Sequence, residues 1–443
     1  MTATPRKPHY GAAMLRLFPL CLLGVGCTPD DPDVSQPTPT PGPTSSATTG
    51  ESGPTGDTAT QTEPTHEVVL GDPVDFSEPG GLRDSHAVGT ALGAGFLVGW
   101  TAEIPMGGTK SVALRLTGPE VLDIQNPGPS ALEVEGPSMV PVADGVAVAM
   151  TDIYQGRTGV RLVTPAGELM PIRWFDGAEA PRMPFASDIA AAPDGSTWTL
   201  WSETLWTLNM DQEDMAQAPT GRFRLAQQDP AAPLSEEVQI LWETAPGGKH
   251  PPDVEVLPDG SVVCAVSERA EVGRPAQVVL RRLSDDARTS VSSLDADGSR
   301  PQMAVDGEGR LAVVWREGLI TDLRAYISLY DEDLNLIGGP LPLSPGWTSD
   351  RPTVAPHPEG WLVAWERPDP VDSDWTGHRE LQVRLLAADG TRWLTPVTTF
   401  DSDDRRRRPA FARNGEHTLL LFEEGPNDDT FVRGAPLTVT TRP

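Results

Sequence analysis

The chain has 443 residues, of which 38% are hydrophobic, and 34 basic against 63 acidic side chains give it a formal net charge of −29 at pH 7. This acidity argues against nucleic acid as a partner, because phosphate binding needs clustered Lys and Arg, and it favours the solubility of an exported protein. The three cysteines form no Cys-x-x-Cys pair and no zinc-binding spacing, so the sequence predicts no metal site and no cofactor.

Residues 1–26 have the pattern of a secretion signal. Three basic residues precede an apolar run, residues 17–25, that is too short for a stable membrane span. The stretch "LLGVGC" resembles the lipobox of bacterial lipoproteins, although Gly24 stands where that family usually has Leu. The resemblance implies acylation of Cys27 and a lipid anchor in the bacterial envelope, with the outer membrane as the expected location. An ordinary secretory signal with an incidental cysteine is the alternative.

Residues 27–66 follow as a segment rich in Pro, Thr, Ser and Gly. Val34 is its one β-branched aliphatic residue between residues 28 and 65, and this stretch has no aromatic residue. Such a composition cannot bury enough apolar surface to fold. The sequence therefore predicts a disordered tether that holds a globular part, residues 67–443, away from the membrane.

The globular part repeats one short pattern, an apolar strand closed by an apolar residue and then an acid. "GRLAVVWRE" and "GWLVAWE" are two of its seven occurrences. A period near fifty residues, built from strands and turns, is the size of one four-stranded propeller blade. The sequence therefore predicts an all-β fold, a seven-bladed β-propeller of four-stranded blades. The closing apolar residues are Trp100, Met150, Trp201, Val266, Trp315, Trp365 and Phe422.

The last repeat lacks a fourth strand, and residues 67–76 have the Pro-then-apolar form of the fourth strands elsewhere. This N-terminal strand is expected to close the last blade and so to protect its open edge. Two smaller β domains are the alternative fold. The approximate blades are residues 84–136, 137–182, 183–249, 250–299, 300–350, 351–406 and 407–443.

The repeat resembles those of secreted and periplasmic β-propeller proteins, including sialidase-like and TolB-like groups and related bacterial lipoproteins. We therefore expect a monomeric binding, interaction or scaffold module whose partner is an envelope protein or a glycan. A non-enzymatic role is favoured, because no complete catalytic motif is present. The alternatives are an envelope hydrolase that acts on glycans with acids at the channel mouth, and a structural spacer without a ligand.

Candidate site residues come from the strand order within a blade. The first two strands are antiparallel, so a residue that opens the first lies near the acid that closes the second. The resulting charges are expected around one mouth of the central channel. The expected pairs are Arg300 with Glu317, Arg351 with Glu366, and Arg408 with Glu423 or Glu424.

Two interpretations of these pairs remain open at this point. They either tie each blade together, because a guanidinium matches a carboxylate, or they form a charged funnel that binds a small polar ligand or a sugar. The loop that contains Trp375 and His378 is expected at the same mouth. An exposed Trp beside His and acids suits stacking on a ligand, whereas packing against a neighbouring loop is the alternative.

Overall fold

The structure is a computed structural model, and the residues that it describes all lie in the second of two compact units, Thr62–Pro443. The predicted signal, Cys27 and nearly all of the predicted tether therefore lie outside the described residues, and the signal, the anchor and the tether stay predictions. The described residues are 64–77, 83–103, 110–117, 122–124, 137–152, 156–175, 182–205, 221–228, 238–244, 251–271, 274–318, 322–344, 348–368, 378–400, 402, 404–426 and 429–442.

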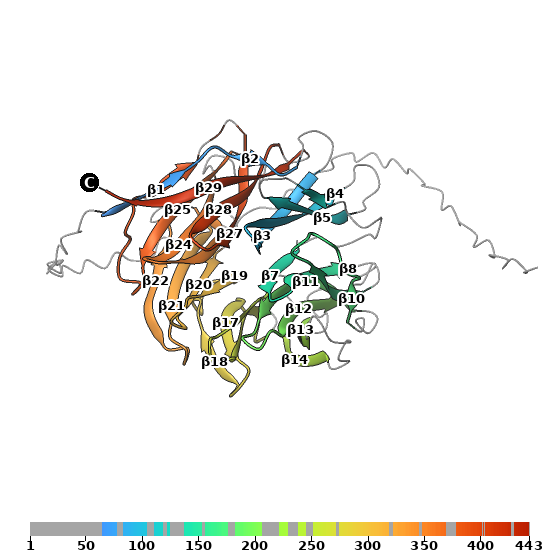
Figure 1. The fold of residues 1–443 in the computed structure, drawn as a ribbon. Coiled ribbons are helices and arrows are strands. Elements are labelled where there is room, and N and C mark those ends of the chain that lie inside the picture. The colour runs from blue at the N-terminus through green and yellow to red at the C-terminus, as the bar shows by residue number, and fades with distance from the viewer. Residues whose placement is uncertain are drawn as a thin grey trace, which may run out of the picture. The chain divides into compact units, whose positions relative to one another are not determined.

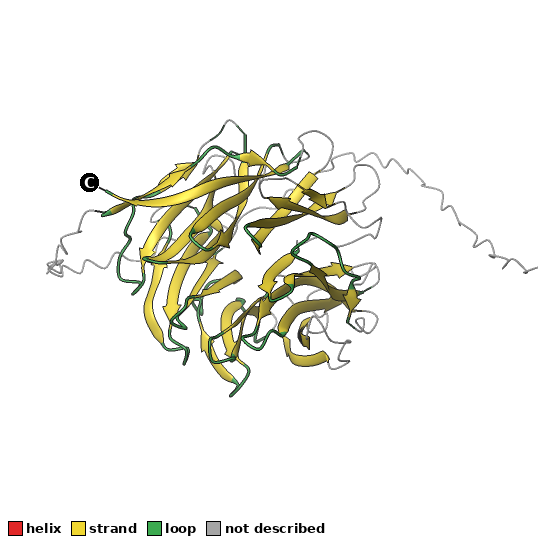
Figure 2. Cartoon of the chain, viewed as in Figure 1, coloured by secondary structure: helices red, strands yellow, loops and turns green. Residues whose placement is uncertain are grey.

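The described part of the chain contains strands and turns and no helix, as Figure 2 shows. Its strands form seven antiparallel sheets, and six of these have four strands in sequence order across the sheet. This confirms the predicted all-β fold of four-stranded antiparallel sheets. None of the described residues forms a helix that is long and apolar enough to cross a membrane.

The strands of the first three sheets in the chain are β3 (Arg83–Leu92), β4 (Gly95–Glu103), β5 (Lys110–Thr117) and β6 (Leu122–Ile124); β7 (Ser138–Val142), β8 (Gly145–Asp152), β9 (Arg157–Val163) and β10 (Arg173–Trp174); and β11 (Arg182–Ala191), β12 (Thr197–Leu205), β13 (Gly221–Gln228) and β14 (Val238–Thr244).

The next three sheets consist of β15 (Asp253–Val256), β16 (Val262–Glu268), β17 (Gln277–Arg282) and β18 (Ala287–Ser290); β19 (Gly298–Val305), β20 (Leu311–Glu317), β21 (Arg324–Tyr330) and β22 (Leu336–Pro342); and β23 (Asp350–His357), β24 (Gly360–Pro368), β25 (Arg379–Ala387) and β26 (Thr398–Phe400).

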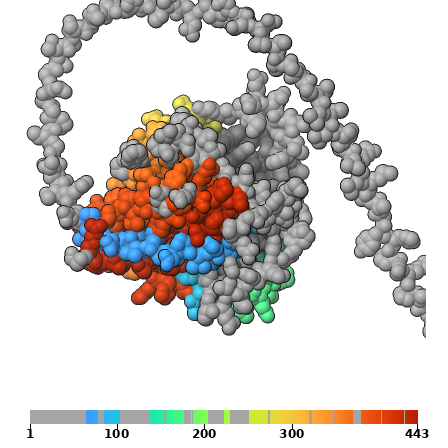
Figure 3. Space-filling view, turned by 90° about the horizontal axis from the view of Figure 1, so that it is seen from above, coloured from blue at the N-terminus to red at the C-terminus, as the bar shows by residue number. Residues whose placement is uncertain are grey.

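The remaining sheet joins the two ends of the described chain. Its strands are β27 (Arg406–Asn414), β28 (His417–Glu424), β29 (Phe431–Thr441), β1 (His66–Leu70) and β2 (Val74–Asp75). Both β1 and β2 pair with β29, so a segment from the N-terminal side supplies the outer edge of the sheet that holds the C-terminal strand. Figure 3 shows this blue segment lying along the red C-terminal strands at the surface.

The first strands of the seven sheets contact one another in sequence order. Each of β3, β7, β11, β15, β19 and β23 contacts the next, and β27 contacts β3, which closes the circle. In Figure 1 the sheets spread outwards from these first strands. Such radial repetition of antiparallel sheets is propeller-like, and it places the start of every first strand at one end of a shared axis.

The core lies between neighbouring sheets because each sheet buries both of its faces. One cluster joins Val314 and Ile327 of the β19–β22 sheet to Trp361 and Trp365 of the β23–β26 sheet. Trp365 is fully buried, and Trp315 is 1% exposed. Trp315 and Trp365, which close two of the repeated strands, therefore fill the space between neighbouring sheets.

Candidate functional site

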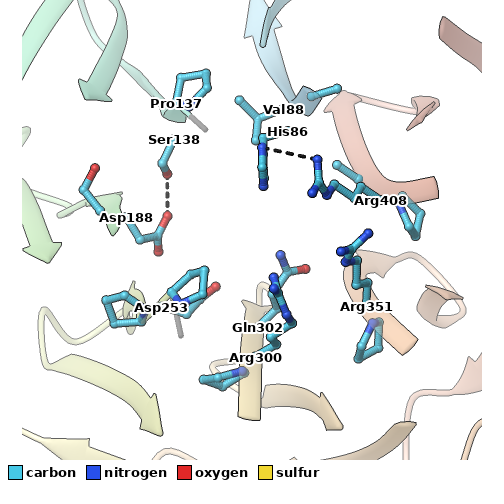
Figure 4. Close-up of a pocket in the computed structure, with 18 residues that line it drawn as sticks. His86, Val88, Pro137, Ser138, Asp188, Asp253, Arg300, Gln302, Arg351 and Arg408 are labelled. Atoms are coloured by element: carbon cyan, nitrogen blue, oxygen red, sulfur yellow. Dashed lines mark hydrogen bonds between the residues drawn. The ribbon is translucent and has the colours of Figure 1, made fainter. Parts of the chain in front are cut away.

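A cavity of about 160 Å³ lies among the seven first strands, and we call it the central pocket. All seven of these strands, or the residues directly before them, contribute to its lining, so it lies on the shared axis of the sheets. Figure 4 shows the side chains that surround it. The polar lining residues are His86, Ser138, Ser187, Asp188, Asp253, Arg300, Gln302, Arg351 and Arg408.

Four lining residues occupy equivalent, left-handed backbone positions on four consecutive first strands. They are His86 (φ 57°), Arg300 (φ 52°), Arg351 (φ 45°) and Arg408 (φ 49°). Each lies where the register with the second strand shifts, which is a β-bulge. A left-handed residue with a Cβ costs roughly 1 to 2 kcal/mol, and a bulge re-aims its side chain. Backbone strain is therefore present at these four positions, all of which line the pocket.

The proline after each arginine explains why the chain bulges there. Pro301, Pro352 and Pro409 have no N–H to donate to a ladder of strand hydrogen bonds, so a proline is tolerated at a bulge or an edge. The Arg-Pro dipeptide is therefore the sequence signal of the bulge, and it recurs in three of the four strands.

Two of the predicted charge pairs are present. Arg351 Nη1 lies 3.1 Å from Glu366 Oε1, and Arg408 Nη1 lies 2.8 Å from Glu423 Oε1. Glu366 is fully buried and Glu423 is 1% exposed. The predicted neighbourhood of arginines and closing acids thus exists, and it lies beside the central pocket.

The same two carboxylates also hold the bulge of the next sheet. Arg408 donates its backbone N–H to Glu366 Oε1 at 2.7 Å, and His86 donates its backbone N–H to Glu423 Oε1 at 2.8 Å. Charge-assisted hydrogen bonds of this kind are among the strong ones. Each carboxylate therefore stabilises the left-handed position on the neighbouring sheet, and these bonds offset part of its strain.

A second set of arginines, which the sequence interpretation missed, comes from the third and fourth strands. These side chains donate to the acids that close the second strands, and in an antiparallel hairpin the end of the second strand lies beside the start of the third. An Arg near the start of the third strand was the available signal in three of these sheets, whereas Arg281 lies near the end of β17 and Arg288 lies on β18. The contacts are Arg222 and Arg224 with Glu203, Arg281 and Arg288 with Glu268, Arg379 with Glu366, and Arg433 with Glu424.

The other predicted site residues have different surroundings. Glu317 accepts hydrogen bonds from the Ser293 backbone N–H at 2.7 Å and from Trp315 Nε1 at 2.8 Å, and its pairing with Arg300 stays a prediction. His378 is half-buried and directly precedes β25. Trp375 lies outside the described residues, so its place at the pocket mouth also stays a prediction.

The side of the pocket across from Arg351 and Arg408 is acidic, and the sequence interpretation did not identify it. Asp188 accepts hydrogen bonds from the Ser138 hydroxyl and, at 2.8 Å, from the Val254 backbone N–H. Asp253 lines the same pocket from the next strand, β15. The register between the first and second strands was the available signal. Asp188 and Asp253 occupy the same register position as Gln302, which lies two residues after Arg300.

The two halves of the pocket differ in their ionisation. Burial raises the pKa of Asp188, and burial together with the charges of Asp188 and Glu255 raises the pKa of Asp253 well above its ordinary value. Burial also opposes ionisation of Glu366, but Arg351, Arg379 and the Arg408 N–H outweigh it, so the pKa of Glu366 is lowered. Glu366, beside the arginines, therefore gains a proton less readily than an ordinary carboxylate, whereas Asp188 and Asp253 gain protons more readily.

No protein-family model and no curated protein matches the chain. A protein of unknown function from Dyadobacter fermentans has a similar structure, with a TM-score of 0.50 and 11% identity over 84% of this chain and 99% of that one. A Trypanosoma rangeli sialidase gives a TM-score of 0.43 and 10% identity over 70% of this chain, which spans 56% of the sialidase. A Fusarium graminearum α-L-arabinofuranosidase gives 0.45 and 9% identity, over 68% of this chain and 91% of that one. These similarities concern the fold alone, and the site must be interpreted from its own residues.

Proposed function

We propose that the chain is an exported, lipid-anchored β-propeller of seven blades whose central pocket binds a small anionic ligand, such as an acidic sugar of the cell envelope. Seven sheets and the closed circle of contacts among their first strands support the blade count. The pocket at the axis of such a fold is a common place for a ligand site. The binding function rests on the side chains that line it.

One observation carries the anionic ligand: Arg300, Arg351 and Arg408 line a single pocket from three consecutive strands. A guanidinium has five donors in a planar fork that suits a carboxylate or a phosphate. The raised pKa values of Asp188 and Asp253 reduce the negative charge across the pocket, so an anion meets less repulsion there. The three arginines occupy equivalent bulge positions on consecutive first strands, so the bulges bring all three side chains to the lining of one pocket.

Binding of galacturonate to residues 64–443 is expected by isothermal titration calorimetry, with galactose as the neutral comparison. Arg300→Gln is expected to weaken galacturonate binding about tenfold, because it removes a charge-assisted hydrogen bond. Arg274→Gln is the matched control, since its side chain is 74% exposed and does not belong to the pocket lining. Equal binding of galactose, or no effect of Arg300→Gln in a folded variant, would contradict the anion site. Turnover of oligogalacturonate would instead establish the hydrolase alternative.

The lipid anchor has its own test, because it depends on residues outside the described part of the chain. Cells that express the full chain with radiolabelled palmitate are expected to label it through Cys27, so Cys27→Ser removes the label and releases the protein from membranes. Cys264→Ala is the control, since Cys264 is fully buried in β16 and its thiol is not accessible for acylation in the folded protein. A full chain that is secreted unlabelled would overturn the anchor.

A further inference from the structure

The acidic half of the central pocket is not needed by a simple anion site. Asp188 and Asp253 lie on adjacent strands and both line the cavity. Within the described residues, no ion pair joins either carboxylate to a cationic side chain, whereas Glu366 and Glu423 each have arginine partners. Figure 4 shows Asp188 and Ser138 on one side of the pocket and Arg351 and Arg408 on the other. The pocket is therefore dipolar.

A structural role accounts for part of this acidic half. Asp188 holds the Val254 N–H of the next strand, and Asp253 accepts a hydrogen bond from the Met303 backbone of the strand after it. Each of these contacts needs an acceptor oxygen at its position, but none of them requires two like charges on adjacent strands. Two carboxylates in a partly buried site without a cation raise the free energy of the empty pocket. A cationic ligand group would remove that cost.

We infer that the central pocket takes a small zwitterion, whose anionic group lies among the arginines and whose ammonium group lies between Asp188 and Asp253. The inference rests on the proposed anion site and adds the second charge of the ligand. A cavity of about 160 Å³ suits a ligand of the size of an amino acid or an amino sugar acid. The Ser138 hydroxyl, which already bonds to Asp188, lies beside the same group as a further polar contact.

The dipolar lining also predicts which ligands are rejected. A ligand with two anionic groups would place one against the aspartates, and a diamine would place one ammonium against the arginines. Only a molecule with opposite charges at its two ends satisfies both halves. Specificity of this kind comes from repulsion of the wrong ligand as much as from attraction of the right one.

The test uses straight-chain ω-amino acids, from glycine to 6-aminohexanoate, and the carboxylates and amines of matching length. Titration calorimetry on residues 64–443 is expected to find one amino acid that binds about tenfold more tightly than its matched carboxylate. Asp253→Asn should remove that difference and leave the carboxylate affinity within about twofold, while Arg300→Gln should weaken both ligands. Asp72→Asn, an exposed residue between β1 and β2, is the matched control for the loss of one acid.

The outcomes separate the inference from the function on which it rests. Carboxylates that bind as tightly as every amino acid would overturn the zwitterion and leave the anion site intact. Amines that bind as tightly as the amino acids would overturn it as well. If neither carboxylates nor amino acids bind, both the anion site and the zwitterion are wrong. The ligand series needs no variant, so a failure of Asp253→Asn to fold does not affect these conclusions.

Discussion

Replacing Glu366 with alanine is expected to lower the free energy of unfolding by about 4 kcal/mol, because it removes the carboxylate of a buried ion pair and leaves its cations behind. Arg379, which is 5% exposed, and Arg351 both donate to Glu366, and the Arg408 backbone N–H donates to it from the next sheet. One side chain thus joins two adjacent sheets, so its loss affects both.

Urea unfolding of residues 64–443 measures this effect, and Glu359→Ala is the matched control. Glu359 pairs with His66 at 2.7 Å, but its side chain is 46% exposed. An exposed pair contributes about 0 to 1 kcal/mol, so this variant should unfold close to the unmodified protein. A loss at Glu366 no larger than the loss at Glu359 would show that the buried network is not a source of stability.

The pH dependence of the same group has a definite sign. The folded-state pKa of Glu366 lies below its ordinary value of 4.5, so its contribution to stability is present above that pH and is lost as the pH falls through the folded pKa. Acidification should therefore destabilise the unmodified protein, and the Glu366→Ala variant should lose less stability over the same range.

The fold was predictable from the sequence where the determining pattern is local. Trp315 and Trp365 close short apolar strands after Gly-containing turns, and both are buried between sheets as that pattern requires. The same holds for the four-stranded antiparallel sheets, because strand length and turn chemistry recur in each unit. The pairs of Arg351 and Arg408 with closing acids were predictable because each pair lies within a single hairpin.

The rest of the site depends on how residues of different sheets are placed relative to one another, and no local sequence pattern predicts that placement. In other first strands an arginine stands two residues before the position of Asp188 and Asp253. Here that place is taken by Ala186 and Pro251, so the Arg-Pro signal does not mark the two aspartates. Arg379 was missed because it belongs to the third strand, after a loop of variable length. The convergence of seven strand starts on one cavity appears only when all sheets are in place.

Glu255→Gln is expected to stabilise the protein by about 2 kcal/mol at pH 8, because it removes a carboxylate that the folded state holds poorly. Burial and the nearby charge of Asp188 raise the pKa of Glu255 to about 8, from an ordinary value of 4.5. The stability that its protonated form contributes is full below pH 4.5 and is lost as the pH rises towards 8. The side chain is half-buried in β15, which limits the effect.

Urea unfolding between pH 5 and pH 8 checks this sign. The free energy of unfolding of the unmodified protein should fall across this range more steeply than that of Glu255→Gln, whereas Glu416→Gln, in an exposed turn, should behave as the unmodified protein does. Parallel curves of unfolding free energy against pH for Glu255→Gln and the unmodified protein would contradict the predicted sign.

The charge of Glu255 also raises the pKa of Asp253. The changes in unfolding free energy caused by Asp253→Asn and Glu255→Gln should therefore combine to less than their sum. Repulsion in this acidic region therefore grows as the pH rises and its carboxyl groups ionise, and a bound ammonium group would relieve it.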